Sequence, residues 1–204
     1  MKKAKKALLL ALCAVLLVGA TIAGTVAYLT STTQEVKNTF TAGNVTITLD
    51  EAKVDEYGVE VANAARVTEN KYKLIPGHTY TKDPTIHIKG GSEACYLFVK
   101  VTNGLANIEG SNKIHDQILT NGWVVVDEDN GIYGKVTALD AREIAADKYK
   151  DVAVFGELTI ADTANVASYT TATINVQACA IQADGFKDMN DAWTTGFGSV
   201  FPTN

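Results

Sequence analysis

The sequence predicts an all-β fold, a jelly-roll-like two-sheet sandwich with one or two short helices, preceded by an N-terminal signal helix. From residue 38 onward apolar and polar residues alternate, as in Val45, Ile47 and Leu49. A period of two indicates a strand with one buried face. Such runs recur about eight times along the chain, which suits two packed antiparallel sheets.

Several strands have individual signals. The near-continuous apolar stretch 96–101 predicts a strand covered on both faces. Asn130-Gly131, between two β-rich runs, predicts a hairpin, and Pro76-Gly77 predicts a tight turn. The remaining predicted strands are 85–88, 123–126, 132–136, 152–160 and 169–182, and in the last of these Ala172, Ile174, Val176, Ala178 and Ala180 share one face while Cys179 lies on the other.

Two stretches have helical signals. In 140–149, Asp140 and Glu143 have the spacing of a capping box, which predicts a helix. A second helical turn is expected at 187–193. Both are expected to cover sheet edges.

The N-terminus has the three parts of a secretory signal. Four lysines lie within the first six residues, an apolar run covers 7–18, and small residues are frequent in 19–27. We therefore expect a cleaved signal peptide at 1–28, an extension at 29–43 and a β-sandwich domain at 44–204. A retained anchor is the alternative, since 7–33 carries no charge, and a lipid-modified Cys13 is disfavoured by the bulky Leu12 before it.

The charge balance excludes some partners. The chain has 18 basic and 23 acidic residues, and removing 1–28 removes four lysines and no acid, which leaves 14 against 23 and a net charge of −9. An acidic domain is a poor partner for nucleic acid or anionic membranes. We expect membrane contact only through the uncleaved signal segment.

No stretch of the sequence predicts an active site. His78, His87 and His115 lack the spacing of a zinc motif, and His87 is expected to point away from Ile86 and Ile88 as an exposed or hydrogen-bonded residue. The acidic residues at 127–130 fit a solvated hairpin tip better than a calcium loop. The carboxylates at 50–56 lie in a polar connection and are expected to be solvated. We expect no enzyme activity, no cofactor and no metal.

Two cysteines remain after cleavage, Cys95 and Cys179, and both lie in predicted strands. In an exported protein such a pair suggests a disulfide, but two buried free thiols fit equally well.

The segment after the signal is rich in β-branched residues and contains no proline. It has strand propensity but too little apolar surface to bury itself. Such a segment is suited to adding to an exposed sheet edge, its own or a neighbour's, and head-to-tail addition to a neighbour produces a filament. A flexible leader or an intramolecular edge strand is the alternative.

Several stretches together resemble the TasA/camelysin family of Gram-positive exported proteins, which are processed by the signal peptidase SipW. They are GTVAYLT at 24–30, NTFTAGNVTITL at 38–49, LIPG at 74–77 with TKD at 81–83, the strand at 96–101, and 176–186 with Trp193.

The resemblance implies a jelly-roll fold and, as in TasA-like members, assembly into biofilm-matrix fibres in which the N-terminal strand of one subunit completes a neighbour's sheet. It places Ala27, Tyr28 and Leu29 around the scissile bond and a donor strand over 29–43, with Leu29, Thr30, Val36 and Phe40 as its principal residues. The expected partners are further copies of the chain, sister proteins with the same leader, and a SipW-like signal peptidase.

The expected location is therefore secreted, in the extracellular matrix or on the cell surface of a Gram-positive bacterium. Two other functions remain open. One is a monomeric, adhesin-like binding module at the surface. The other is a camelysin-like metallopeptidase, which the missing zinc motif disfavours.

Overall fold

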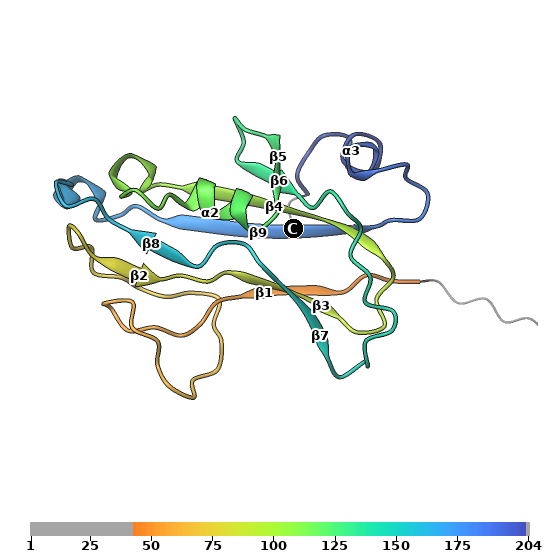
Figure 1. Cartoon of the computed structure of the whole chain (residues 1–204), viewed down its shortest axis with the longest axis horizontal. Helices are drawn as coiled ribbons and strands as arrows, with labels where there is room; N and C mark the ends of the chain where they lie inside the picture. The colour runs from red at the N-terminus through yellow and green to blue at the C-terminus, as the bar shows by residue number, and fades with distance from the viewer. Residues whose placement is uncertain (1–42, 203–204) are drawn as a thin grey trace, which may run out of the picture. The chain divides into compact units, whose positions relative to one another are not determined.

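A computed structural model of the chain describes residues 43–202 (Figure 1). The predicted signal peptide, the cleavage region at Ala27, Tyr28 and Leu29, and the proposed donor residues Leu29, Thr30, Val36 and Phe40 lie outside the described residues. These expectations remain predictions.

The described chain is mostly β, with three antiparallel sheets and two short helices, which confirms the predicted fold class at that level. The sheets have the strand orders β1-β3-β7, β2-β8 and β5-β6-β4-β9. The strands are β1 Ile47–Asp50, β2 Thr79–Thr81, β3 Thr85–Lys89, β4 Cys95–Asn103, β5 Val124–Asp127, β6 Ile132–Gly134, β7 Tyr149–Ala153, β8 Glu157–Thr159 and β9 Ile174–Gln182. The helices are α2 Ile114–Thr120 and α3 Met189–Asp191, with single helical turns at Ala106–Ile108, Val166–Tyr169 and Ala192–Gly196.

The β1-β3-β7 and β2-β8 sheets lie end to end, with β2 followed by β3 and β7 followed by β8. Thr81 lies opposite Glu157 in the β2–β8 pair and Thr85 lies opposite Ala153 in the β3–β7 pair, so both pairs follow one register. Hydrogen bonds from Lys82 N to Gly156 O (3.1 Å) and from Val154 N to Pro84 O (2.9 Å) link them. The ladder is interrupted at Pro84, which has no N–H to donate. The single strand predicted at 152–160 is therefore divided into β7 and β8.

The main hydrophobic core lies between two layers of strands. Figure 1 shows the long strands β4 and β9 on one side of it and β1, β3, β2 and β8 on the other. Odd-numbered residues of β4, including Leu97 and Val99, point into this core, as do Ile86 and Ile88 of β3. The alternation read from the sequence thus identifies the buried face of each layer.

A second hydrophobic cluster covers the outer face of β4. Phe98 packs against Trp193 and Phe197, with ring centroids 5.3 and 5.6 Å apart, and Met189 of α3 belongs to the same cluster. The prediction that strand 96–101 is covered on both faces is confirmed. The helical turn expected at 187–193 is also confirmed, since Asp188 caps α3 by accepting a hydrogen bond from Asp191 N (2.9 Å).

The helix predicted at 140–149 is wrong. The Asp140 carboxylate accepts a hydrogen bond from Arg142 N (3.0 Å) and pairs with the guanidinium of the same residue. The Ala141 and Lys148 carbonyls accept hydrogen bonds from Gly91 N (2.8 Å) and Gly90 N (2.9 Å) of a distant loop rather than from a following helical turn. The chain therefore continues through turns until β7 begins at Tyr149. The structure has a helix earlier in the chain, at α2, which buries Ile114 and Ile118 one turn apart.

Both predicted turns form, and each places a glycine in the left-handed region. Gly77 has φ +73° and Gly131 has φ +63°. His78 N donates to Ile75 O (3.2 Å) across the first turn, and β5 pairs with β6 beside the second. A Cβ on Gly131 would collide with Val101 O.

We predict that Gly131→Ala destabilises the domain more than Gly91→Ala. Both positions have positive φ, which costs an alanine about 1–2 kcal/mol, but only Gly131 faces a backbone oxygen, whereas a Cβ on Gly91 meets nothing within 4 Å. Denaturant unfolding of the two variants measures the difference. Equal losses would contradict the close approach of Gly131 to Val101.

Candidate functional site

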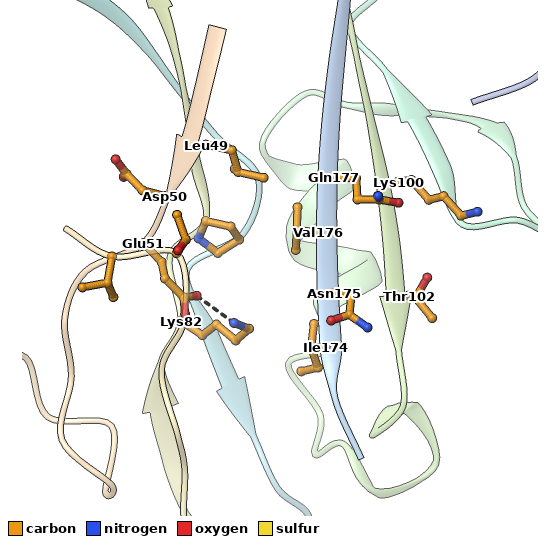
Figure 2. A pocket seen from close by; sticks show the side chains of 13 residues that line it. Leu49, Asp50, Glu51, Lys82, Lys100, Thr102, Ile174, Asn175, Val176 and Gln177 are labelled. Atoms are coloured by element: carbon orange, nitrogen blue, oxygen red, sulfur yellow. Dashed lines mark hydrogen bonds and ion pairs between the residues drawn. The ribbon is translucent and has the colours of Figure 1, made fainter. Parts of the chain in front are cut away.

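A groove with a volume of about 540 Å³ lies between β1 and β9, the neighbouring edge strands of the two layers (Figure 2). Leu49 extends from β1 toward β9, while Val176 and Ile174 lie on the side of β9 that faces β1. The polar side chains of Lys100, Thr102, Asn175 and Gln177 line the groove from the outer face of the β4–β9 pair.

The outer edge of β9 has a free row of backbone groups. Hydrogen bonds from Gly104 N to Thr173 O (2.9 Å) and from Ala183 N to Ala94 O (2.6 Å) fix which β9 residues bond to β4. By the alternation of an antiparallel ladder, the N–H and C=O groups of every second residue then point away from β4. Within residues 43–202 these groups have no hydrogen-bond partner, and they belong to Ile174, Val176, Ala178 and Ala180.

The outer edge of β1 has a shorter free row. Lys89 N donates to Thr46 O (2.9 Å), which directs the N–H and C=O groups of Ile47 and Leu49 away from β3. The next outward residue, Glu51, exchanges two 2.8 Å hydrogen bonds with Val67. Among the described residues, Ile47 and Leu49 are left without partners at this edge.

The side chains of these edge residues cover the main core only partly. Ile47 and Leu49 of β1 and Ile174, Val176 and Ala178 of β9 pack against the main core but are only partly buried. Unpaired backbone and half-buried apolar side chains therefore occur together along one side of the domain. This combination is typical of a site that accepts another strand.

The opposite edge of the layer that contains β1, formed by β7 and β8, is partly closed. The Trp123 indole donates to Ala153 O (2.9 Å), and the Asn121 amide donates to Val154 O (3.0 Å). Further along, the Gln117 amide donates to Glu157 O (2.9 Å), and Gly110 N donates to Thr159 O (2.8 Å). Local groups thus bond to the outer edge of β8 and to the Ala153 end of β7. The outward backbone groups of Tyr149 and Asp151 in β7 have no partner among residues 43–202.

A nearly buried ion pair occupies one end of the groove (Figure 2). Lys82 Nζ lies 2.7 Å from Glu51 Oε2, and their side chains are 11% and 8% exposed. The Asn70 amide donates to Glu51 Oε1 (3.0 Å), and Lys82 lies 5.7 Å from the centre of the Tyr72 ring. Burial and the negative charge of Glu51 both raise the pKa of Tyr72. The groove therefore has a charged pair at one end in addition to the polar side chains along β4 and β9.

A charge network lies on the outer face of the β1-β3-β7 sheet. His87 Nδ1 lies 2.6 Å from Asp151 Oδ1, and His87 Nε2 lies 2.9 Å from Asp50 Oδ1. Arg66 pairs with Asp50 and, at 2.9 Å, with Asp83. The expectation that His87 points away from Ile86 and Ile88 and forms hydrogen bonds is confirmed.

The other two histidines have separate partners. His78 Nε2 lies 2.8 Å from Tyr57 O, and His115 Nδ1 lies 3.0 Å from the Tyr133 hydroxyl. In the part of the chain that the structure describes, no three His, Cys, Asp or Glu side chains are grouped so as to hold a metal ion. At the acidic hairpin tip, the Asp127 carboxylate accepts hydrogen bonds from Asn130.

Cys95 and Cys179 are free thiols on opposite faces of one sheet. Cys95 pairs with Gln182 and belongs to the main core, whereas Cys179 pairs with Phe98 and packs against the second cluster. Side chains on opposite faces cannot reach disulfide geometry. Of the two alternatives that the sequence left open, the structure has the free thiols.

No protein-family model matches the chain, and no curated protein matches it either. Within residues 43–202, no helix has the length and apolar character needed to cross a membrane.

We predict that Lys82→Met destabilises the domain by about 3–5 kcal/mol, because it leaves the Glu51 carboxylate buried without its cation. The double variant Glu51→Leu with Lys82→Met should recover part of that loss. The matched control is Arg142→Met in the exposed Asp140–Arg142 pair, which should change stability little. Denaturant unfolding measures all three variants, and a Lys82→Met variant as stable as the control would disprove the burial of the pair.

We also predict that the folded protein resists thiol alkylation. Burial raises the pKa of Cys95 to about 11 and that of Cys179 to about 12, so the reactive thiolate is rare at neutral pH. In the chain 29–204, which lacks Cys13, mass spectrometry should detect little labelling in the native state and two labelled sites in denaturant without reductant. Labelling in denaturant only after reduction would indicate a disulfide instead.

Proposed function

We propose that this protein is an exported structural subunit of extracellular fibres that assembles by N-terminal strand donation. The observation that carries the proposal is the groove between β1 and β9, where two rows of unpaired backbone groups accompany half-buried apolar side chains. A strand of a second copy placed there satisfies the backbone groups and covers the core.

The segment at 29–43 has the properties that such a groove requires. Val36 and Phe40 are four residues apart and thus share one face of a strand, while Lys37 and Thr39 lie on the other. The stretch 30–40 is long enough to pair along β9, which has nine residues. Thr30 and Gln34, on the same face as Val36, supply polar side chains suited to the Glu51–Lys82 end.

The arrangement of the sheets supports the finer fold assignment. Because the β1-β3-β7 and β2-β8 sheets share one register, we infer that they act as one layer of a jelly-roll-like, two-sheet sandwich. That fold, the signal-like N-terminus and the resemblance to the TasA/camelysin family together favour processing by a SipW-like peptidase. They also favour a location in the matrix or on the surface of a Gram-positive cell.

Donation between copies has a geometric consequence. Each subunit carries one donor segment and one groove, and these are different surfaces. Contacts between different surfaces are head-to-tail, so they produce open filaments unless the rotation closes a ring. The local hydrogen bonds along β8 and at Ala153 hinder strand addition at those positions.

We predict that residues 29–204 form filaments and that residues 44–204 do not. Within 29–204, Val36→Asp or Phe40→Asp should abolish assembly because a charge would enter the apolar part of the groove. Thr39→Asp, on the opposite face of the donor, is the matched control and should retain assembly. Electron microscopy and sedimentation report the outcome, and filaments from the truncated form would refute strand donation.

We predict further that Ala178→Pro in 29–204 produces a subunit that stops filament growth. Proline removes only the outward N–H of Ala178, which makes no bond to β4. Such a subunit retains its donor but has a damaged groove, so a small fraction mixed with the unmodified protein should shorten filaments. Ala178→Ser, which keeps the N–H, is the control. Equal filament lengths with both variants would exclude β9 as the receiving edge.

An adhesin-like binding module is the second candidate, favoured by one observation. Tyr57, Val59 and Val61 are 40%, 61% and 42% exposed on the connection between β1 and β2. Exposed apolar residues at a loop tip are suited to contacting a partner. Size-exclusion chromatography separates the two functions, since a chain 29–204 that stays monomeric at every concentration supports the binding module.

A further inference from the structure

His87 joins three strands on the outer face of the β1-β3-β7 sheet. It belongs to the central strand β3, and its two ring nitrogens contact Asp50 of the edge strand β1 and Asp151 of the other edge strand β7. The imidazole is 14% exposed at the side chain, so water competes weakly for these contacts. β1 is also the strand that forms one wall of the groove.

Only the charged imidazolium donates to both carboxylates. Neutral histidine has one N–H, so one ring nitrogen would present a lone pair to a negatively charged oxygen. The cluster of three carboxylates, Asp50, Asp83 and Asp151, has Arg66 as its other cation. Loss of the imidazolium charge therefore removes a hydrogen bond and leaves the carboxylates less compensated.

The other groups near the His87 imidazole come from β1, β3 and β7. Thr48 of β1 lies directly opposite His87, and Tyr149 of β7 packs edge-on to the imidazole with ring centres 6.1 Å apart. Lys89 lies two residues along β3 on the same face. The groups in direct contact with the ring nitrogens are the two carboxylates.

We propose that His87 is a pH-sensitive tie that holds β1 firmly in mildly acidic solution and releases it as the pH rises, thereby regulating the groove. This inference rests on the proposed function, because the groove is the surface regulated. When β1 is held in place, one side of the groove is already ordered. Binding of a strand then costs less free energy, because β1 does not have to be ordered on binding.

The direction of the pH effect follows from the balance of contacts. Burial lowers the pKa of His87, but hydrogen bonds to Asp151 and Asp50 outweigh it and raise the pKa above its ordinary value of 6.5. A group with a raised folded-state pKa contributes its full stability below the unfolded value, and that contribution is lost as the pH rises through the folded value. The tie is therefore strongest in acid.

Hydrogen exchange of individual amides in the chain 29–204 tests the tie directly. Thr48 and Asp50 have N–H groups directed to β3, so their protection reports the attachment of β1. After correction for intrinsic exchange, we expect their protection to fall several-fold between pH 5.5 and pH 8.5, while amides of β4 bonded to β9 keep theirs.

Substitutions assign the effect to His87. His87→Asn should remove the pH dependence at Thr48 and Asp50, and His115→Asn, whose imidazole contacts the Tyr133 hydroxyl, should leave it intact. Asp151→Asn changes an exposed carboxylate and should shift the His87 titration, followed by NMR, to lower pH. Unchanged protection across the pH range, or an unaltered pH dependence in His87→Asn, would overturn the proposal.

Assembly provides the second readout. Sedimentation against pH is measured for the unmodified chain, His87→Asn and His115→Asn. Mildly acidic solution should favour polymer for the unmodified chain and His115→Asn, and the pH response should be smaller in His87→Asn. Polymer formed with equal pH responses in all three overturns the tie and leaves strand donation standing. No polymer at any pH, with exchange at Thr48 still governed by His87, refutes strand donation and leaves the tie standing.

Discussion

The central constraint on this domain is that backbone groups of a strand edge need hydrogen-bond partners. β9 is a nine-residue strand that bonds to β4 along its whole length on one side and, within residues 43–202, to nothing on the other. The residues with outward backbone groups are also those whose apolar side chains point into the main core. One added strand would satisfy both requirements, because pairing and burial fall on the same residues.

Backbone carbonyls near the opposite edge, in the β7 and β8 region, have hydrogen-bond partners within the domain. Trp123, Asn121 and Gln117 place side-chain donors on the carbonyls of the β7 and β8 region. Pro84 interrupts the ladder without separating the two paired segments, because Val154 N still donates to its carbonyl. Beside the groove, the Glu51–Lys82 pair and the His87 contacts fix the end and the outer face of β1. The open edge therefore has a defined shape.

Much of the fold was predictable from periodicity, and the exceptions have physical reasons. The strand predicted at 169–182 begins only at Ile174, after a helical turn at Val166–Tyr169, but its alternation correctly placed Ile174 and Val176 on the core face. The apolar run at 96–101 correctly indicated a strand covered on both faces. The helix at 140–149 failed because the carbonyls of Ala141 and Lys148 bond to the distant loop at 90–91, which no local pattern indicates. The helix α2 was missed because only Ile114 and Ile118 show its period in seven residues.

The candidate site was less accessible from the sequence. Which edges remain unpaired depends on strand order, and strand order is set by pairing between distant residues such as Leu97 and Ala180. The partners of His87 come from strands 37 and 64 residues away, so no local pattern indicates them. The donor segment was the one part of the site that composition suggested, since it combines strand propensity with little apolar surface.

Amide exchange along β9 tests the central claim most directly, because its alternation distinguishes paired from unpaired edges residue by residue. In the isolated domain 44–204, Gln177 and Cys179 should be protected by β4, while Val176, Ala178 and Ala180 exchange quickly. In filaments of 29–204, all five should be protected. Val176, Ala178 and Ala180 that exchange equally fast in the filaments would contradict the account.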